Sequence, residues 1–161
     1  MPQFSIKLKS GLEIPVFTMP LLARVAVCDV LVDVIEKPAL RARLYLAVVG
    51  MAWEHAASQE ARVPLAERTV PAPTWKPFAK CDGDVYGYGA GVIEAVAAMG
   101  ESVMALRAQG DLLALDVWES LNPSAEAVAR ARGNLSPEAA GAPASSGSPL
   151  ATSEAPSPPS T

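Results

Sequence analysis

Apolar and polar residues alternate over the first seventeen positions of the chain. Apolar side chains occupy every second position on either side of a Ser10-Gly11 step: Phe4, Ile6, Leu8, then Leu12, Ile14 and Val16. A period of two on both sides of a Ser-Gly pair predicts a β-hairpin over residues 4–17. A lone hairpin is marginally stable in water, so we expect this one to pack on helices or to extend the sheet of a neighbouring molecule.

Farther along, the apolar spacing changes to that of helices. Apolar residues recur at intervals of three and four over about residues 19–36, which predicts a helix that Thr18 can cap. Its many β-branched residues leave a strand open for part of the segment. A second predicted helix, residues 38–57, is apolar on nearly all sides, which is typical of a central helix.

Three shorter helices are predicted in the second half of the chain. They span about residues 85–99, 102–109 and 112–121, with Gly110 ending the second and Asp111 capping the third. Together with the hairpin they predict a mainly α protein of the α+β class, in which an N-terminal hairpin precedes a bundle of about four to five helices.

The chain is predicted to form one globular domain, residues 1–132, followed by a tail. The sequence has 161 residues, enough for one domain with a core. Residues 133–161 hold six prolines, seven serines and no aromatic residue. A segment with so little apolar surface to bury is expected to be a disordered tail rich in proline, serine and alanine.

Residues 58–80 lack helical or strand periodicity and contain four prolines. A loop of this length inside a small domain needs a physical reason. Trp75 and Phe78 supply one, because two large aromatic side chains can either anchor the loop over the core or dock into another subunit. In the docking alternative Trp75 and Phe78 are partner contacts, and Phe4 and Ile6 of the hairpin are further candidates.

A stripe of small residues, Gly87, Gly91 and Ala95, recurs every four positions in the helix predicted at 85–99. Side chains four apart lie on one helix face. The stripe therefore predicts close packing against another helix, and Gly91→Leu is expected to destabilise the protein.

The charge distribution argues against nucleic acid as a partner. Thirteen lysines and arginines against 17 acidic residues give a net charge of −4, whereas proteins that neutralise phosphates carry an excess of bases. Residues 82–126 hold eight acidic residues and a single base, Arg107, while residues 1–43 are mildly basic. The acidic region either meets the basic one, within a molecule or between copies, or forms a solvated face.

Membrane insertion and secretion are not expected either. The longest strongly apolar run, Leu44 to Trp53, is half of the ~20 residues that cross a bilayer. The first residues lack the apolar stretch of a secretory signal, so we expect a cytoplasmic protein.

Two candidates for chemistry in the sequence fail on spacing, and a third depends on the fold. The Gly87–Gly91 segment lacks the third glycine position and the preceding strand of a dinucleotide loop. Asp82-Gly83-Asp84 begins like a calcium loop, but its later positions do not continue the pattern. His55 could shuttle protons with Glu54, or form a thiol dyad with Cys28 or Cys81. Either requires that the fold bring the side chains together. We expect no enzymatic activity, no cofactor and no metal.

The order of elements carries a resemblance to a known class of proteins. It comprises a hairpin with the turn Lys9–Glu13, a threonine-capped helix, a central apolar helix, a helix entered through Asp84–Gly87, a break at Met99–Ser102 and a helix ending at Gln109–Leu112. Over residues 1–122 this layout resembles small accessory proteins of tailed bacteriophages, especially tail assembly chaperones and similar virion-associated proteins.

The resemblance implies a non-enzymatic protein that binds other proteins. A tail assembly chaperone would hold the tape-measure protein soluble while tail subunits assemble around it, in the host cytoplasm. The alternative is a structural subunit of the neck, tail or baseplate that stays in the virion and self-associates or pairs its hairpin with a neighbour. A second alternative is a cytoplasmic regulatory binding module unrelated to phage.

Overall fold

The computed structural model describes residues 4–34, 36–122, 129–130 and 132. The chain divides into two units, Met1–Asn122 and Pro123–Thr161. All the strands and helices named below belong to the first unit. The expected body, 1–132, therefore extends past the end of that unit, and the expected tail, 133–161, lies outside the described residues.

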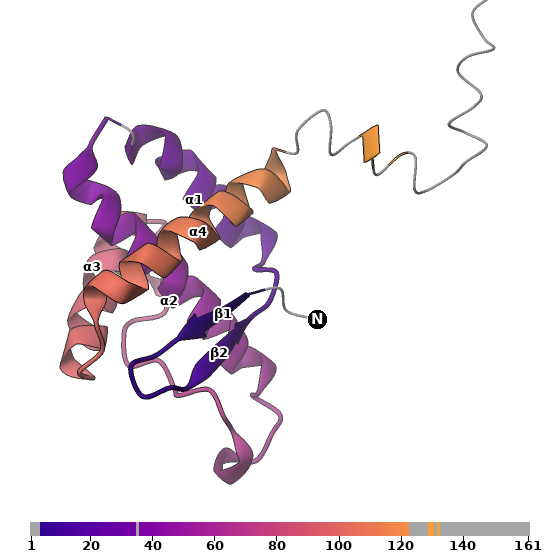
Figure 1. The fold of residues 1–161 in the computed structure, drawn as a ribbon, viewed down its shortest axis with the longest axis vertical. Coiled ribbons are helices and arrows are strands. Elements are labelled where there is room, and N and C mark those ends of the chain that lie inside the picture. Colours follow the sequence, from indigo (N-terminus) through magenta and orange to yellow (C-terminus); the bar gives the residue numbers. More distant parts are fainter. Residues whose placement is uncertain (1–3, 35, 123–128, 131, 133–161) are drawn as a thin grey trace, which may run out of the picture. The chain divides into compact units, whose positions relative to one another are not determined.

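The described part of the chain forms one hairpin and four α-helices (Figure 1). This confirms the predicted mainly α fold with an N-terminal hairpin. The elements are β1 (Phe4–Lys7), β2 (Glu13–Val16), α1 (Leu21–Val34), α2 (Arg41–Gln59), α3 (Val85–Ala98) and α4 (Val103–Leu121), with 3-10 turns at Pro38–Leu40, Leu65–Glu67 and Phe78–Lys80.

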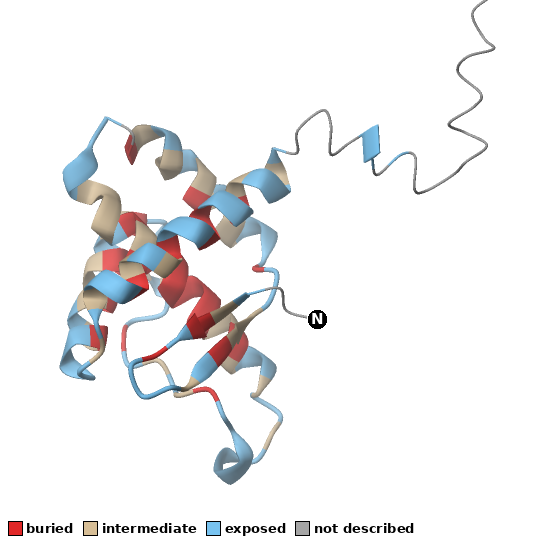
Figure 2. Cartoon of the chain, in the orientation of Figure 1, coloured by how far each residue is buried: buried red, intermediate tan, exposed pale blue. Residues whose placement is uncertain are grey.

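Helix α2 is the centre of the molecule, as its apolar sequence predicts. Every residue from Leu46 to Trp53 is buried, and α1, α3, α4 and β2 all contact this helix. Figure 2 shows the buried residues gathered on α2 and on the elements that surround it, while the outer side of α4 is exposed. A helix enclosed on so many sides needs apolar residues around its whole circumference.

The hairpin packs on α2 and α4 through one face. Its strands are antiparallel, with Ile6 opposite Ile14 and Phe4 opposite Val16. Both isoleucines are fully buried, whereas Phe4 is 40% exposed. The Ile6–Ile14 pair therefore lies in the core, and the Phe4–Val16 pair at the end of the hairpin lies near the surface.

The outer edge of β1 is occupied by a side chain of α4. Gln109 accepts from the backbone N–H of Lys7 through Oε1 at 2.7 Å and donates through Nε2 to the Lys7 carbonyl at 3.1 Å. Both backbone polar groups of Lys7 point away from β2, so Lys7 and Glu13 form a non-hydrogen-bonded pair. Hydrogen-bonded and non-hydrogen-bonded pairs alternate along an antiparallel ladder, so the Ser5–Pro15 pair two residues away is also non-hydrogen-bonded. Pro15 has no N–H, and at this position the ladder loses no hydrogen bond because of it.

Side chains and a glycine mark the ends of α3 and α4 as expected. Asp84 caps α3 by accepting from the N–H of Gly87 at 2.9 Å, and Ser102 caps α4 at 3.2 Å. Gly100 ends α3 with φ +81°. The N–H of Glu101 then bonds to the Val96 carbonyl at 3.0 Å, which satisfies a carbonyl that the helix end leaves unpaired.

The predicted break at Gly110 is wrong, because α4 runs without interruption from Val103 to Leu121. Gly110 is buried, and a Cβ at this position would overlap the Tyr45 carbonyl oxygen of α2. Glycine inside a helix costs about 1 kcal/mol relative to alanine. Here it allows α4 to cross closely over α2, and that contact outweighs the cost.

The predicted small-residue stripe is also wrong as a helix contact. An added Cβ at Gly91 meets nothing within 4 Å, and at Gly87 it meets only the capping carboxylate of Asp84. The glycine of α3 that approaches α2 is Gly89, whose added Cβ would overlap the Arg43 carbonyl. Of the predicted stripe, only Ala95 packs against the core, and it does so partly buried. The open space at Gly91 removes the physical reason to expect that Gly91→Leu destabilises.

Candidate interaction surface

The aromatic residues of the long loop face inward, as the anchoring alternative predicts. Trp75 is only 7% exposed and packs edge-on against Trp53 of α2, with ring centroids 5.2 Å apart. Its indole N–H donates to Glu54 Oε1 at 3.0 Å and to the Tyr88 hydroxyl at 2.9 Å. Phe78 is half-buried and packs edge-on against Tyr88 at 5.2 Å.

Glu54 is the polar partner on which these groups converge. Besides the indole, its carboxylate accepts from the Tyr88 hydroxyl at 2.6 Å and from the backbone N–H of Phe78 at 3.3 Å. Burial, and next the hydrogen bond to Glu54, raise the pKa of the Tyr88 phenol. The phenol therefore stays protonated and remains a donor.

A second carboxylate, that of the residue capping the C-terminal end of α2, holds the middle of the loop. Glu60 accepts from the Thr69 hydroxyl at 2.6 Å and from the backbone N–H groups of Thr69 and Val70, each at 2.9 Å. These hydrogen bonds lower the pKa of the Glu60 carboxyl, the one from the Thr69 hydroxyl most. The loop is thus a cover that α2 holds in place.

Two of the expected partner contacts are therefore corrected. Trp75 and Ile6 are both buried in the core and present no free surface. Hydrogen bonds hold Trp75 in place, and Ile6 lies opposite Ile14, which is also fully buried. Phe78 is half-buried, and Phe4 alone of the four keeps a large exposed fraction.

Helix α1 exposes a group of four large apolar side chains. Leu21, Val25 and Val32 are 57%, 40% and 57% exposed, and the adjoining Leu22 is 83% exposed. Positions 21, 25 and 32 lie on one side of the helix, and half-buried Cys28 completes the row. We call Leu21, Leu22, Val25 and Val32 the α1 stripe.

The opposite side of α1 is packed. Val27 and Val34 are buried, and several neighbours lie partly buried against the core: Ala23, Ala26, Val30 and Leu31. Helix α1 is thus apolar on two sides, of which the fold covers one. The signal was present in the sequence, because a helix at the edge of a bundle can bury only one of two apolar faces.

Helix α4 also exposes apolar side chains, here among acidic ones. Met104, Leu112 and Leu115 are 68%, 61% and 52% exposed. The exposed carboxylates of α4 are Asp111, Asp116 and Glu119. The outer face of α4 therefore combines apolar contact area with negative charge.

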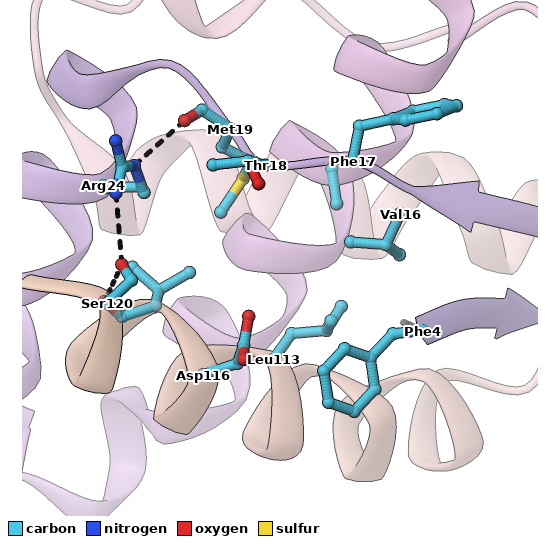
Figure 3. Close-up of a pocket in the computed structure, with 11 residues that line it drawn as sticks. Phe4, Val16, Phe17, Thr18, Met19, Arg24, Leu113, Asp116 and Ser120 are labelled. Atoms are coloured by element: carbon cyan, nitrogen blue, oxygen red, sulfur yellow. Dashed lines mark hydrogen bonds between the residues drawn. The ribbon is translucent and has the colours of Figure 1, made fainter. Parts of the chain in front are cut away.

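A pocket of about 470 Å³ opens between the end of the hairpin, the start of α1 and the second half of α4 (Figure 3). Its walls are mostly apolar and come from the hairpin, the connection between β2 and α1, and α4, with Ala52 of α2 also lining it: Phe4, Val16, Phe17, Met19, Leu113 and Val117. The half-exposed Phe4–Val16 pair, which continues the buried Ile6–Ile14 pair, lies on the hairpin side.

The polar groups of this pocket differ in how far they are satisfied. Arg24 donates to the Met19 carbonyl at 3.0 Å and to the Ser120 hydroxyl at 3.3 Å. Asp116, on the α4 side in Figure 3, is exposed and has no hydrogen bond or ion pair within the part of the chain that the structure describes. The pocket is thus a mostly apolar cavity beside a hydrogen-bonded guanidinium and a solvent-exposed carboxylate.

The candidates for chemistry do not come together into one site. His55 lies edge-on to Phe17, with ring centroids 6.5 Å apart, and its Nε2 lies 3.4 Å from Gln59 Nε2. Glu54, its neighbour in sequence, bonds to the loop instead. Both cysteines are free, and the Cys81 thiol donates to the Pro77 carbonyl at 3.4 Å.

Two further observations concern reactivity. Burial, and next the Asp29 carboxylate, raise the pKa of the Cys28 thiol, which lowers its thiolate content at neutral pH. No group of three or more His, Cys, Asp or Glu side chains is placed to hold a metal ion among the residues described.

No ion pair between described residues joins the acidic region of the sequence to the basic one, although the Glu101 carboxylate accepts from the backbone N–H of Lys9 at 2.7 Å. The ion pairs between described residues are Lys7 with Glu13 at 3.9 Å and Lys37 with Asp33 at 3.0 Å. All four residues lie in the mildly basic first part of the chain. This supports the solvated face for the acidic residues of α4.

Comparison of the chain with protein-family models, curated proteins and solved structures gave no match. Within the described ranges, no helix has both the length and the apolar character needed to span a bilayer.

Proposed function

We propose that this protein is a non-enzymatic binding protein that covers an apolar helical segment of another protein. The α1 stripe carries the proposal. Four large apolar side chains, all at least 40% exposed, lie on one helix at the edge of the bundle. Contiguous exposed apolar surface is typical of a protein-interaction site, and an apolar helix face is one of the recurring ways to bind another helix.

The resemblance of the layout to tail assembly chaperones suggests what the partner is. The candidates are the tape-measure protein and other tail subunits of a phage. Such a role needs apolar surface and negative charge on a folded domain, and α1 and α4 supply both. It needs no catalytic residue.

Sheet extension is less well supported than helix binding as the mode of association. Gln109 already occupies both polar groups of Lys7 on the outer edge of β1. On β2, Pro15 removes a donor from the outer edge. A virion subunit would then also associate through its helices. Mass spectrometry of purified particles separates the two roles, because a chaperone is absent from them and a structural subunit is present.

Binding of a synthetic helix tests the proposal. The probe is a fluorescein-labelled amphipathic helix with leucines on one face and lysines and glutamates in equal number on the other. We expect the protein to bind it, as measured by fluorescence anisotropy. The double variant Leu22→Glu/Val32→Glu is expected to weaken binding by at least about tenfold, because it places two charges in the apolar contact.

Leu65→Glu is the matched control. Leu65 is 79% exposed and lies in the loop rather than on α1, so the same change of side chain should leave affinity unchanged. Circular dichroism melting of each variant verifies that it is folded. Equal affinity of the wild-type protein and the α1 double variant would contradict the proposal.

A further inference from the structure

The pocket between the hairpin and α4 provides a second contact for a partner, with its own chemistry. We propose that it receives a large apolar side chain of the bound segment while Asp116 pairs with a lysine or arginine beside that side chain. The bound segment is then a basic amphipathic helix. This inference rests on the proposed function and specifies the class of partner.

The size and walls of the pocket fit an apolar anchor. Its volume of about 470 Å³ lies within the range of about 300–1,000 Å³ that is typical of ligand pockets. Phe4 and Phe17, 40% and 36% exposed, form part of its wall and would lose contact with water when a side chain enters. Aromatic pockets that exclude water are typical places for the residues that contribute most to binding.

Two parts of the wall continue the packed core. Phe4 and Val16 continue a strand pair whose next members, Ile6 and Ile14, are fully buried. On the other side, Val117 is buried on α4, and the Ser120 hydroxyl donates to the Val117 carbonyl at 2.7 Å. A preformed pocket loses little conformational entropy when it is filled.

The acidic residues of α4 favour a basic group beside the pocket, although Arg24 keeps its positive charge because both of its hydrogen-bond partners are neutral. Two donors of the Arg24 guanidinium are already bonded, to Met19 and Ser120, whereas Asp116 accepts no hydrogen bond from the residues described. Helix α4 as a whole holds three acidic residues against Arg107 alone. Complementary charge at the rim of an apolar contact fixes orientation and selects partners.

The location of the pocket suits a segment that also lies on α1. Thr18, Met19 and Arg24 line the pocket, and they flank the first residue of the α1 stripe, Leu21, along the chain. Asp116 lies one helical turn from exposed Leu112 on α4. A helix anchored in the pocket therefore begins its contact next to apolar surface on both helices.

The experiment compares two labelled helices that share their apolar residues and differ in the flanking ones, lysine in one and glutamate in the other. Anisotropy titrations are performed with the wild-type protein and with three folded variants. Asp116→Lys reverses the charge at the rim, and exposed Glu94→Lys on α3 makes the same charge change outside the pocket. Thr18→Trp fills the pocket from an exposed lining position.

We expect the lysine helix to bind at least about tenfold more tightly than the glutamate helix. Asp116→Lys should weaken binding of the lysine helix by about tenfold and Glu94→Lys by less than about twofold, because only the first removes a paired charge. Thr18→Trp should weaken it by about tenfold or more, since it occupies the space of the anchor.

Three results would overturn the inference: tighter binding of the glutamate helix, equal effects of Asp116→Lys and Glu94→Lys, or no effect of Thr18→Trp. The proposed function fails separately, if the mixed-charge helix binds the α1 double variant as well as the wild-type protein. Loss of binding on α1 with no effect in the pocket would keep the first proposal and reject the second.

Discussion

Helices α1 and α2 are both rich in apolar residues, yet they differ in what surrounds them. Around α2 lie the other three helices, the hairpin and the loop, and every residue from Leu46 to Trp53 is buried. Helix α1 packs on one side and exposes Leu21, Leu22, Val25 and Val32 on another. An apolar sequence therefore has two outcomes in this molecule, buried core in α2 and exposed surface on one side of α1.

A loop can cover an apolar surface only where its own polar groups find hydrogen-bond partners. The loop over α2 brings backbone and indole N–H groups that must bond to something once they leave water, and Glu54 and Glu60 accept them. The exposed face of α1 is covered by no such segment among the described residues. Glu54 of α2 and Glu60 at its C-cap thus hold the loop that covers this side of α2.

The largest expected difference in stability lies between a variant of Trp75 and a variant of Leu22. Trp75→Ala removes a buried indole that packs on Trp53 and is expected to lower the free energy of unfolding by about 3–5 kcal/mol. Leu22→Ala, at a side chain 83% exposed, should change it by at most about 0.5 kcal/mol. Urea denaturation of both variants measures the difference. A large loss of stability in Leu22→Ala would show that α1 is covered within the protein, and the comparison would fail.

The hairpin and the four helices could be predicted from the sequence because their signals are local. A period of two around Ser10-Gly11 and capping residues such as Asp84 act within a few positions of the chain. The continuity of α4 could not, since Gly110 is a common end signal whose meaning depends on Tyr45 of another helix.

The candidate site was harder to predict, for the same reason. Whether Trp75 docks or anchors depends on Glu54, 21 residues earlier, and whether the apolar residues of α1 are core or surface depends on what lies next to them. Both outcomes depend on contacts between residues far apart in the sequence. Proline spacing and aromatic content identify the loop as important without saying which way its rings face.

An intermediate difference in stability is expected between variants of Gly89 and Gly91, two of the glycines of α3. Gly89→Ala should destabilise the protein by about 1–3 kcal/mol, because the new Cβ overlaps the Arg43 backbone carbonyl, which cannot move aside without shifting α2. Gly91→Ala, where the Cβ meets nothing within 4 Å, should stabilise it by about 0.5–1 kcal/mol through helix propensity. Thermal melting of the pair tests this. Equal effects would mean that α3 does not approach α2 through Gly89.

The smallest expected effect is a pH dependence of the loop that covers α2. Hydrogen bonds from Thr69 and Val70 hold the pKa of the Glu60 carboxyl below its ordinary value of 4.5. A carboxyl with a lowered pKa in the folded state stabilises the protein above that ordinary value, and the contribution is lost as the pH falls through the lower folded value. Glu60→Gln should therefore have a lower melting temperature than the wild-type protein at neutral pH. The gap should narrow as the pH falls below about 4.5, since protonation removes the same charge from the wild-type side chain. A gap that stays constant through this range would show that the carboxylate charge does not hold the loop, and the covering of α2 would then rest on Glu54 and the aromatic contacts alone.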